Sequence, residues 1–151
     1  MIKIVCIGKI KEEFFKEAIA EYTKRISKYS KLEIIECNDY SGMDINNILE
    51  KEKQELERYI NERDYVITLE IDGKALSSME LSSKIDNIFL NSSNITFVIG
   101  GSYGLHQEIK NRSNYALSFS KLTFPHQLFR VMLLEQIYRA FKISNNESYH
   151  K

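Results

Sequence analysis

The sequence has few of the residues that mark secreted proteins, membrane proteins and flexible linkers. Its 151 residues include two cysteines, one proline and six glycines. Cys6 and Cys37 lie far apart and form no Cys-x-x-Cys pair, which favours buried free thiols. No apolar run approaches the roughly 20 residues that span a bilayer, and the apolar opening segment lacks a basic leader and a cleavage site. We therefore expect a soluble, cytoplasmic protein with no membrane partner and a single domain over residues 1–151.

Signatures of several enzyme classes are also missing. The three histidines, His106, His126 and His150, have no ligand partners at useful spacing, so no metal site is expected. No Gly-x-Ser-x-Gly elbow points to a serine hydrolase. Neither the Gly-x-Gly-x-x-Gly dinucleotide fingerprint nor a P-loop occurs, which disfavours an NAD-type oxidoreductase.

Charge is balanced overall but unevenly distributed. Residues 1–32 carry eight basic against four acidic residues, residues 33–64 carry four against ten, and residues 106–151 carry seven against three. Two basic ends thus enclose an acidic middle, a pattern compatible with selective contact to a polyanion. Ordinary scatter among solvated faces explains the same pattern equally well.

Short β-like runs alternate with helical stretches, which predicts an α/β fold with a mostly parallel sheet and helices on both faces. A tight turn is expected at Asp72-Gly73. The predicted strands are Ile2–Ile7, Leu32–Cys37, Tyr65–Ile71, Ile95–Ile99 and Tyr115–Phe119; the predicted helices are Glu12–Lys28, Asp44–Asn61, Ser77 or Ser78 to about Leu90, His106–Arg112, and about Pro125 to Ile143.

Two loops at strand ends are candidates for a ligand pocket. The first, Gly100–Gly104, follows a continuous apolar strand, and its glycines permit close approach to the backbone. The second, Phe119–Phe124, offers two phenylalanines and Leu122 that could sandwich a flat base, with hydroxyls and amides for its polar edge. A tight turn and a core-filling loop, both without ligand, are the alternatives.

The last helix and the tail are the other unusual features. The helix is apolar on nearly every side, which favours a homodimer interface, while Glu135 and Arg139 are spaced to form a pair. Arg139 could instead meet an anionic substrate. The tail ends in Tyr149-His150-Lys151, which combines an aromatic ring, an imidazole and a cation, although a frayed terminus is the simpler interpretation.

Taken in order, these motifs closely resemble one bacterial family, the large-subunit ribosomal RNA pseudouridine N3-methyltransferases of the SPOUT (α/β-knot) class. The resemblance covers essentially the whole chain, with a shorter and more divergent middle around Asp39–Glu62, from which no function is drawn. The segments that carry it are Thr68–Gly73, Phe97–Leu105, Arg112–Ser118, Phe119–Gln127, Leu134–Ala140 and Tyr149–Lys151.

The resemblance implies a deep C-terminal trefoil knot, an obligate homodimer and S-adenosylmethionine as the methyl donor. It implies a pseudouridine in the decoding-centre helix of 23S rRNA as substrate, modified within the assembled ribosome. By match, the donor would contact these residues: Leu69, Gly100, Gly101, Phe119, Ser120, Lys121, Leu122, Thr123 and Phe124.

On the acceptor side, the N3 proton must leave to a general base or to an ordered water, and His150, acting across the dimer, is one candidate for the base. Tyr149 would stack on or orient the base, and Arg139 or Arg130 would bind phosphate or stabilise charge on the base carbonyls. A non-enzymatic nucleotide sensor with the same fold, associated with the ribosome, is the competing hypothesis.

Overall fold

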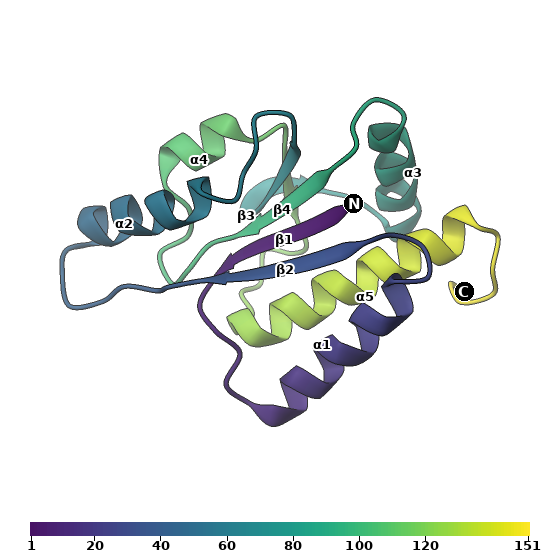
Figure 1. Cartoon of the computed structure of the whole chain (residues 1–151), viewed down its shortest axis with the longest axis horizontal. Helices are drawn as coiled ribbons and strands as arrows, with labels where there is room; N and C mark the ends of the chain where they lie inside the picture. The colour runs from purple at the N-terminus through teal and green to yellow at the C-terminus, as the bar shows by residue number, and fades with distance from the viewer.

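A sheet of five parallel strands organises the chain in this computed structural model, which describes residues 1–151 (Figure 1). The elements in chain order are β1 (Ile2–Ile7), α1 (Glu13–Ile26), β2 (Leu32–Cys37), α2 (Ile45–Glu57), β3 (Tyr65–Ala75), α3 (Ser78–Phe89), β4 (Ile95–Ile99), α4 (Gln107–Arg112), β5 (Tyr115–Ser118) and α5 (His126–Ser144).

The strand order is β2-β1-β4-β3-β5, and every neighbouring pair is parallel. The predicted α/β class with a parallel sheet is therefore confirmed, and β1, β2 and β4 have the predicted bounds. Parallel strands bring all their carboxyl ends to one edge of the sheet, where ligands of such folds bind. The order is compatible with the C-terminal trefoil knot, which stays a prediction.

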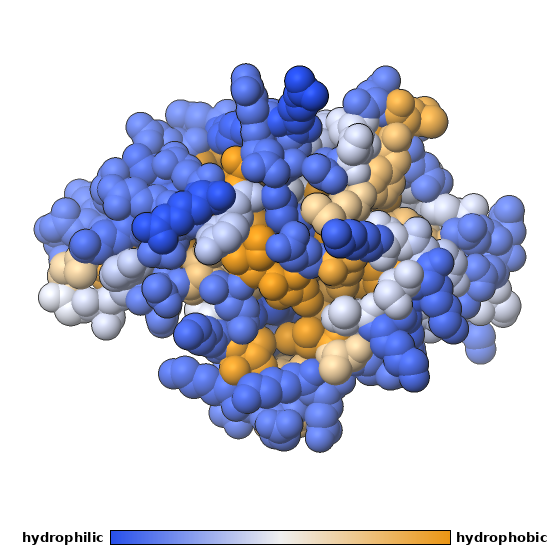
Figure 2. Space-filling model, in the orientation of Figure 1, coloured by the Kyte–Doolittle hydropathy of each residue, from blue (hydrophilic) through white to orange (hydrophobic).

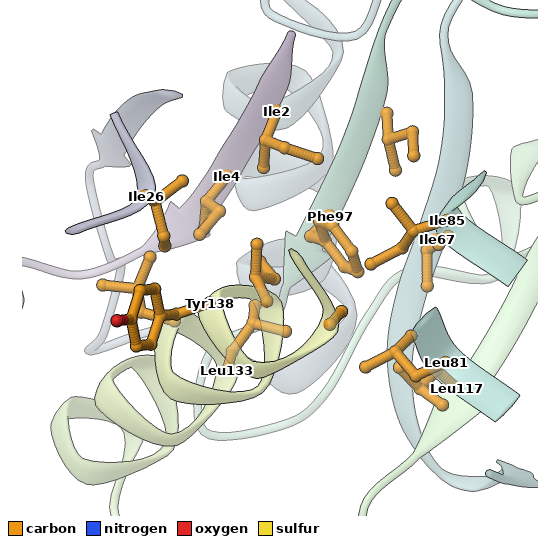
Figure 3. Close-up of a cluster of buried hydrophobic side chains, with 14 of the residues drawn as sticks. Ile2, Ile4, Ile26, Ile67, Leu81, Ile85, Phe97, Leu117, Leu133 and Tyr138 are labelled. Atoms are coloured by element: carbon orange, nitrogen blue, oxygen red, sulfur yellow. The ribbon is translucent and has the colours of Figure 1, made fainter. Parts of the chain in front are cut away.

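Both faces of the sheet are covered by helices, as predicted. Because side chains alternate along a strand, Ile2 and Ile4 of β1 join a core with α1, α3 and α5, whereas Val5 and Ile7 join a second core with α2 and α4. Figure 3 shows the first core, in which Phe97 of β4 and Leu133 of α5 lie between the sheet and the helix layer.

The predicted turn at Asp72-Gly73 is wrong, because β3 continues to Ala75. Leu69 and Lys74 both pair with Leu117 of β5, so the intervening residues bulge out of the ladder before pairing resumes. A Cβ at Gly73 would lie 2.8 Å from the backbone of Ala116. The glycine therefore permits a close strand approach, which its turn-like neighbour Asp72 disguises in the sequence.

Helix ends largely follow the sequence signals. Ser77 and Glu80 form the predicted capping box of α3. The last helix begins at His126, one residue after Pro125, which is its N-cap. None of the helices combines the length and apolar character needed to cross a membrane.

The apolar side chains around α5 are mostly covered by the chain's own sheet and helices. Leu133, Leu134 and Ile137 are fully buried, and α5 packs between α1 and α3 over the sheet. Their burial therefore needs no second subunit, contrary to the reasoning from helix composition. Figure 2 shows apolar surface that remains over the middle of one face, along the edge strand β2 and toward α5. The homodimer stays a prediction.

Candidate active site

A pocket of about 380 Å³ lies at the carboxyl edge of the sheet, where β3, β4 and β5 end. The bulge in β3 contributes Glu70, Ile71 and Asp72, while Ile99 and Leu117 end the neighbouring strands. The loops after β4 and β5 form the other walls. Apolar walls with a few polar groups are typical of small-molecule sites.

The two candidate loops meet at this pocket, although Gly101 and Phe119 are 18 positions apart in the sequence. Eight of the nine residues predicted to bind the cofactor line it. These are Leu69, Gly100, Gly101, Phe119, Ser120, Leu122, Thr123 and Phe124. Lys121 is exposed and does not line the pocket, although both its neighbours do.

Local contacts and backbone conformation explain why glycines follow β4. Only Gly104 has a left-handed conformation, at φ 79°. A Cβ at Gly100 would lie 2.5 Å from the carbonyl oxygen of Gly104, and one at Gly101 would lie 2.9 Å from Oε1 of Glu52. Gly100 is thus required by a backbone contact within the protein, and Gly101 leaves room for the Glu52 carboxylate, reasons that their sequence spacing does not reveal.

The loop after β5 is held by its own hydroxyls and by aromatic packing. Oγ of Ser120 accepts a 2.9 Å hydrogen bond from the amide of Leu122. The ring of Phe129 from α5 lies 4.9 Å from that of Phe119 and 6.4 Å from that of Phe124, between centroids. The loop therefore presents an ordered apolar wall, close to the predicted sandwich.

Three polar groups in the pocket were not singled out by the sequence. Glu70 accepts a 2.6 Å hydrogen bond from the Thr68 hydroxyl and lies 3.9 Å from the ammonium of Lys110. His126 also lines the pocket, and burial, aided by the charge of Arg130, lowers the pKa of its imidazole. Glu70 is positioned by the β3 bulge, which no local motif signals, and His126 by the start of α5.

Three of the four predicted acceptor-side residues form one cluster around Glu135, whereas Arg130 is buried and paired with Glu36. Arg139 forms the predicted pair with Glu135 at 2.6 Å, and its Nη1 lies 3.1 Å from Nδ1 of His150. Tyr149 donates a 3.1 Å hydrogen bond to Glu135, and the Arg139 guanidinium lies 4.7 Å from its ring centroid. The tail is therefore docked on α5 and is not frayed in this structure.

This cluster lies away from the pocket of its own chain. Neither Arg139 nor Tyr149 nor His150 lines the pocket. Because α5 starts beside the pocket at His126 and rises about 1.5 Å per residue, Arg139 lies roughly 20 Å farther along the helix. Figure 1 shows the chain's C-terminus at the end of α5 opposite the carboxyl edge of the sheet.

A second hollow, of about 540 Å³, adjoins the pocket, and we call it the α2 cleft. It shares Gly101, Ser102 and His126 with the pocket. Its other walls come from the start of the β1–α1 connection, from residues 38–43 and from Glu52 and Arg130. Residues of the divergent middle segment, from which the sequence drew no function, thus lie beside the candidate site.

The structure contains no group of three or more histidine, cysteine, aspartate or glutamate side chains suited to hold a metal ion. The candidate site is therefore built from loop backbone, apolar walls and single charged side chains.

Comparison with known proteins agrees with this description. A family model described as a predicted SPOUT methyltransferase matches residues 1–150. Two proteins from Clostridium botulinum, strains Okra / Type B1 and Eklund 17B / Type B, are 54% and 53% identical to the chain over 157 residues. Each is named ribosomal RNA large subunit methyltransferase H, and 99% of both chains is covered in each comparison.

A solved structure shares the fold at much lower identity. A probable methylase family protein from Haemophilus influenzae Rd KW20 superposes with a TM-score of 0.54 and 15% identity, covering 99% of this chain and 70% of that one. The parallel sheet, the loops at its carboxyl edge and the full-length match together show that the chain belongs to the SPOUT methyltransferase family.

Proposed function

We propose that this chain, as a homodimer, transfers a methyl group from S-adenosylmethionine to N3 of a pseudouridine in 23S rRNA. The base would lie in the decoding-centre helix of the assembled ribosome. The strongest support is the similarity to two proteins named as large-subunit rRNA methyltransferases. They are 53–54% identical to this chain, and 99% of each chain is covered. The matched region covers 99% of the chain, so it spans nearly all of both parts of the proposed site.

The pocket suits the methyl donor in size and in chemistry. Its volume of about 380 Å³ lies within the range of roughly 300–1,000 Å³ typical of small-molecule sites. Leu69, Phe119 and Phe124 would hold the flat adenine, while Gly100 and Gly101 let the loop backbone approach it. Glu70 and Asp72 offer carboxylates to hydroxyl or ammonium groups. When bound, S-adenosylmethionine supplies an electrophilic methyl group on its sulfonium.

The acceptor side is proposed to come from the partner subunit, because Arg139, Tyr149 and His150 cannot reach the pocket of their own chain. Apolar groups remain available for such an interface: Phe14 of α1 is 63% exposed and Leu128 of α5 is 37% exposed. These two helices pack against each other, so one contiguous surface could receive the partner.

Loss of the N3 proton must accompany methyl transfer, so the site needs a proton acceptor. Burial, aided by the hydrogen bond to Glu135, raises the pKa of Tyr149 to about 12, which disqualifies Tyr149 as a base at neutral pH. The imidazole of His150 would accept the proton, and Tyr149 would stack on or orient the base. Arg139, already fixed by Glu135, would stabilise charge growing on the base carbonyls.

The decisive test is transfer of labelled methyl from S-adenosylmethionine to ribosomes from cells that lack the enzyme. We expect one methyl per ribosome, on N3 of one pseudouridine, and no transfer to ribosomes that carry uridine there. Calorimetry should show binding of S-adenosylmethionine and none of NAD. Binding of S-adenosylmethionine without any transfer to ribosomes would favour a nucleotide sensor and contradict the proposal.

A further inference from the structure

The floor of the α2 cleft contains a carboxylate with unused hydrogen-bonding capacity. Glu52 is only 4% exposed, and its Oε1 has no hydrogen-bond partner. Its Oε2 accepts one long bond, 3.4 Å, from the amide of Tyr40. Buried polar atoms are nearly always paired in proteins, because an unpaired one loses its hydration without compensation.

Packing fixes this carboxylate beside the methyl-donor pocket. Both carboxylate oxygens lie against Gly101, whose missing side chain leaves room for them. Gly101 also lines the pocket, so one residue separates the two hollows. A ligand that reached Glu52 would therefore lie next to a molecule in the pocket.

The opposite wall of the cleft is held by a second buried charge. Arg130 is 2% exposed and binds Glu36 at 2.6 Å and the carbonyl oxygen of Gly8 at 3.1 Å. Its Nε has no partner. These bonds connect α5 to the carboxyl-terminal ends of β1 and β2.

Two exposed lysines line the cleft, against one exposed carboxylate, that of Asp39. The lysines are Lys9 and Lys11, and neither forms an ion pair. An anion at the entrance would meet these two ammonium groups, while a hydrogen-bond donor at the floor would meet Glu52. A nucleotide carries both features, since its phosphate is anionic and its base presents N–H groups.

We propose that the α2 cleft binds the acceptor nucleotide of the RNA, with Glu52 accepting a hydrogen bond from a base N–H and with Lys9 and Lys11 contacting the flanking phosphates. This inference rests on the proposed function. Pseudouridine has two ring N–H groups, so one can bond Glu52 while the other faces the methyl donor. Uridine has only one, and Glu52 thus contributes to selection of the base.

The test compares three variants of the full-length protein with the wild type in methyl transfer to ribosomes. Glu52→Gln removes the carboxylate with little change of shape. Lys9→Ala/Lys11→Ala removes the two entrance charges. Lys31→Ala/Arg63→Ala is the matched control, because both residues are exposed beside the amino-terminal ends of β2 and β3 and form no ion pair.

Calorimetry should give the same Kd for S-adenosylmethionine in all four proteins. For Glu52→Gln, whose amide oxygen still accepts a hydrogen bond but carries no charge, we expect kcat/KM for ribosomes to fall about 4- to 10-fold. For Lys9→Ala/Lys11→Ala, we expect a higher KM for ribosomes and a salt dependence of KM weaker by about one power of salt concentration per lost contact. The control should match the wild type.

Two results would overturn the inference while leaving the proposed function intact. One is a wild-type enzyme that methylates ribosomes alongside cleft variants whose kcat/KM stays within about twofold of it. The other is loss of S-adenosylmethionine binding in Glu52→Gln, which would give Glu52 a merely structural role. Failure of the wild type itself to methylate ribosomes would instead reject the proposed function, and this inference with it.

Discussion

The two edges of the parallel sheet handle buried charge in opposite ways. At the amino-terminal edge, Lys3 and Asp64 form an ion pair of 3.0 Å, and Asp64 also accepts hydrogen bonds from the Thr96 hydroxyl and the Asn61 amide. At the carboxyl-terminal edge, atoms of Glu52 and Arg130 are buried without partners. All of these side chains are almost fully buried, so burial alone does not distinguish them.

The difference indicates which edge is specialised for stability and which for binding. A buried charge with all its bonds made holds the fold and offers nothing to a ligand. A buried group with bonds unmade destabilises the free protein, and a ligand that completes those bonds recovers the loss. We therefore expect changes at the amino-terminal edge to alter unfolding and changes at the carboxyl-terminal edge to alter binding and turnover.

The largest expected effect concerns the tail, which lies nearer the amino-terminal edge of its own chain. Deletion of Tyr149–Lys151 should reduce methyl transfer by at least about 100-fold, the usual minimum for loss of a proton acceptor. The Kd for S-adenosylmethionine should hardly change, since none of the three residues lines the pocket. Turnover that survives the deletion would remove these residues from the acceptor side.

A comparable effect, but on stability, is expected at the amino-terminal edge. Asp64→Ala leaves the Lys3 ammonium buried without its partner and should lower the free energy of unfolding by about 3–5 kcal/mol, measured with denaturant. The double variant Lys3→Met/Asp64→Leu should recover most of this loss. A loss below about 1 kcal/mol would show that the pair is as weak as those on protein surfaces.

The Asp64 contribution should also depend on pH. Burial raises the pKa of Asp64, but bonds from Asn61, Lys3 and Thr96 outweigh it and hold the pKa below its ordinary value. A depressed folded-state pKa gives stability that is present above the unfolded pKa and is lost as pH falls through the folded one. The difference in unfolding free energy between wild type and Asp64→Asn should therefore shrink in acid.

A smaller effect is expected for Gly100→Ala at the rim of the pocket. The new Cβ would lie 2.5 Å from the Gly104 carbonyl, so the loop must shift. We expect affinity for S-adenosylmethionine to fall about 10-fold or more, since displacement of a binding loop by an ångström can cost even more. Calorimetry measures this. Ser93→Ala, at an exposed bend outside the pocket, serves as control and should bind normally.

The smallest effect is a gain in stability. Burial is the main cause of the raised pKa of Glu52, opposed by the Tyr40 amide and aided by Asp39. A carboxyl whose folded pKa is raised loses stability as pH rises through that pKa. Glu52→Gln cannot ionise and should be more stable than the wild type by about 1 kcal/mol at neutral pH, with the gain vanishing in acid. Thermal unfolding at both pH values checks this.

The sequence predicted the helices and strands better than the contacts between them. Short apolar, β-like runs located β1, β2 and β4 at their observed bounds, because local patterning decides such elements. The β3 bulge was missed because Asp72-Gly73 is typical of turns, and only the approach of Ala116 explains the glycine. The contact of Glu52 with Gly101 joins residues 49 positions apart. No local pattern in a single sequence encodes such a contact.

The sequence likewise predicted the groups of residues in the candidate site better than their arrangement. The motifs indicated both loops of the pocket and the Arg139–Tyr149–His150 set, which the structure indeed gathers into two groups. They did not indicate the separation of those groups along α5, nor that α1 and α3 already cover most of that helix. Both facts depend on how the whole chain packs.

The separation of pocket and tail along α5 has a genetic consequence. If each pocket is completed by the other subunit, one allele that encodes a defective pocket and another that lacks the tail damage different halves of the same composite centre. A cell that expresses both would assemble mixed dimers in which one centre is whole. Two loss-of-function alleles would then restore methylation together, whereas two alleles with the same defect would not.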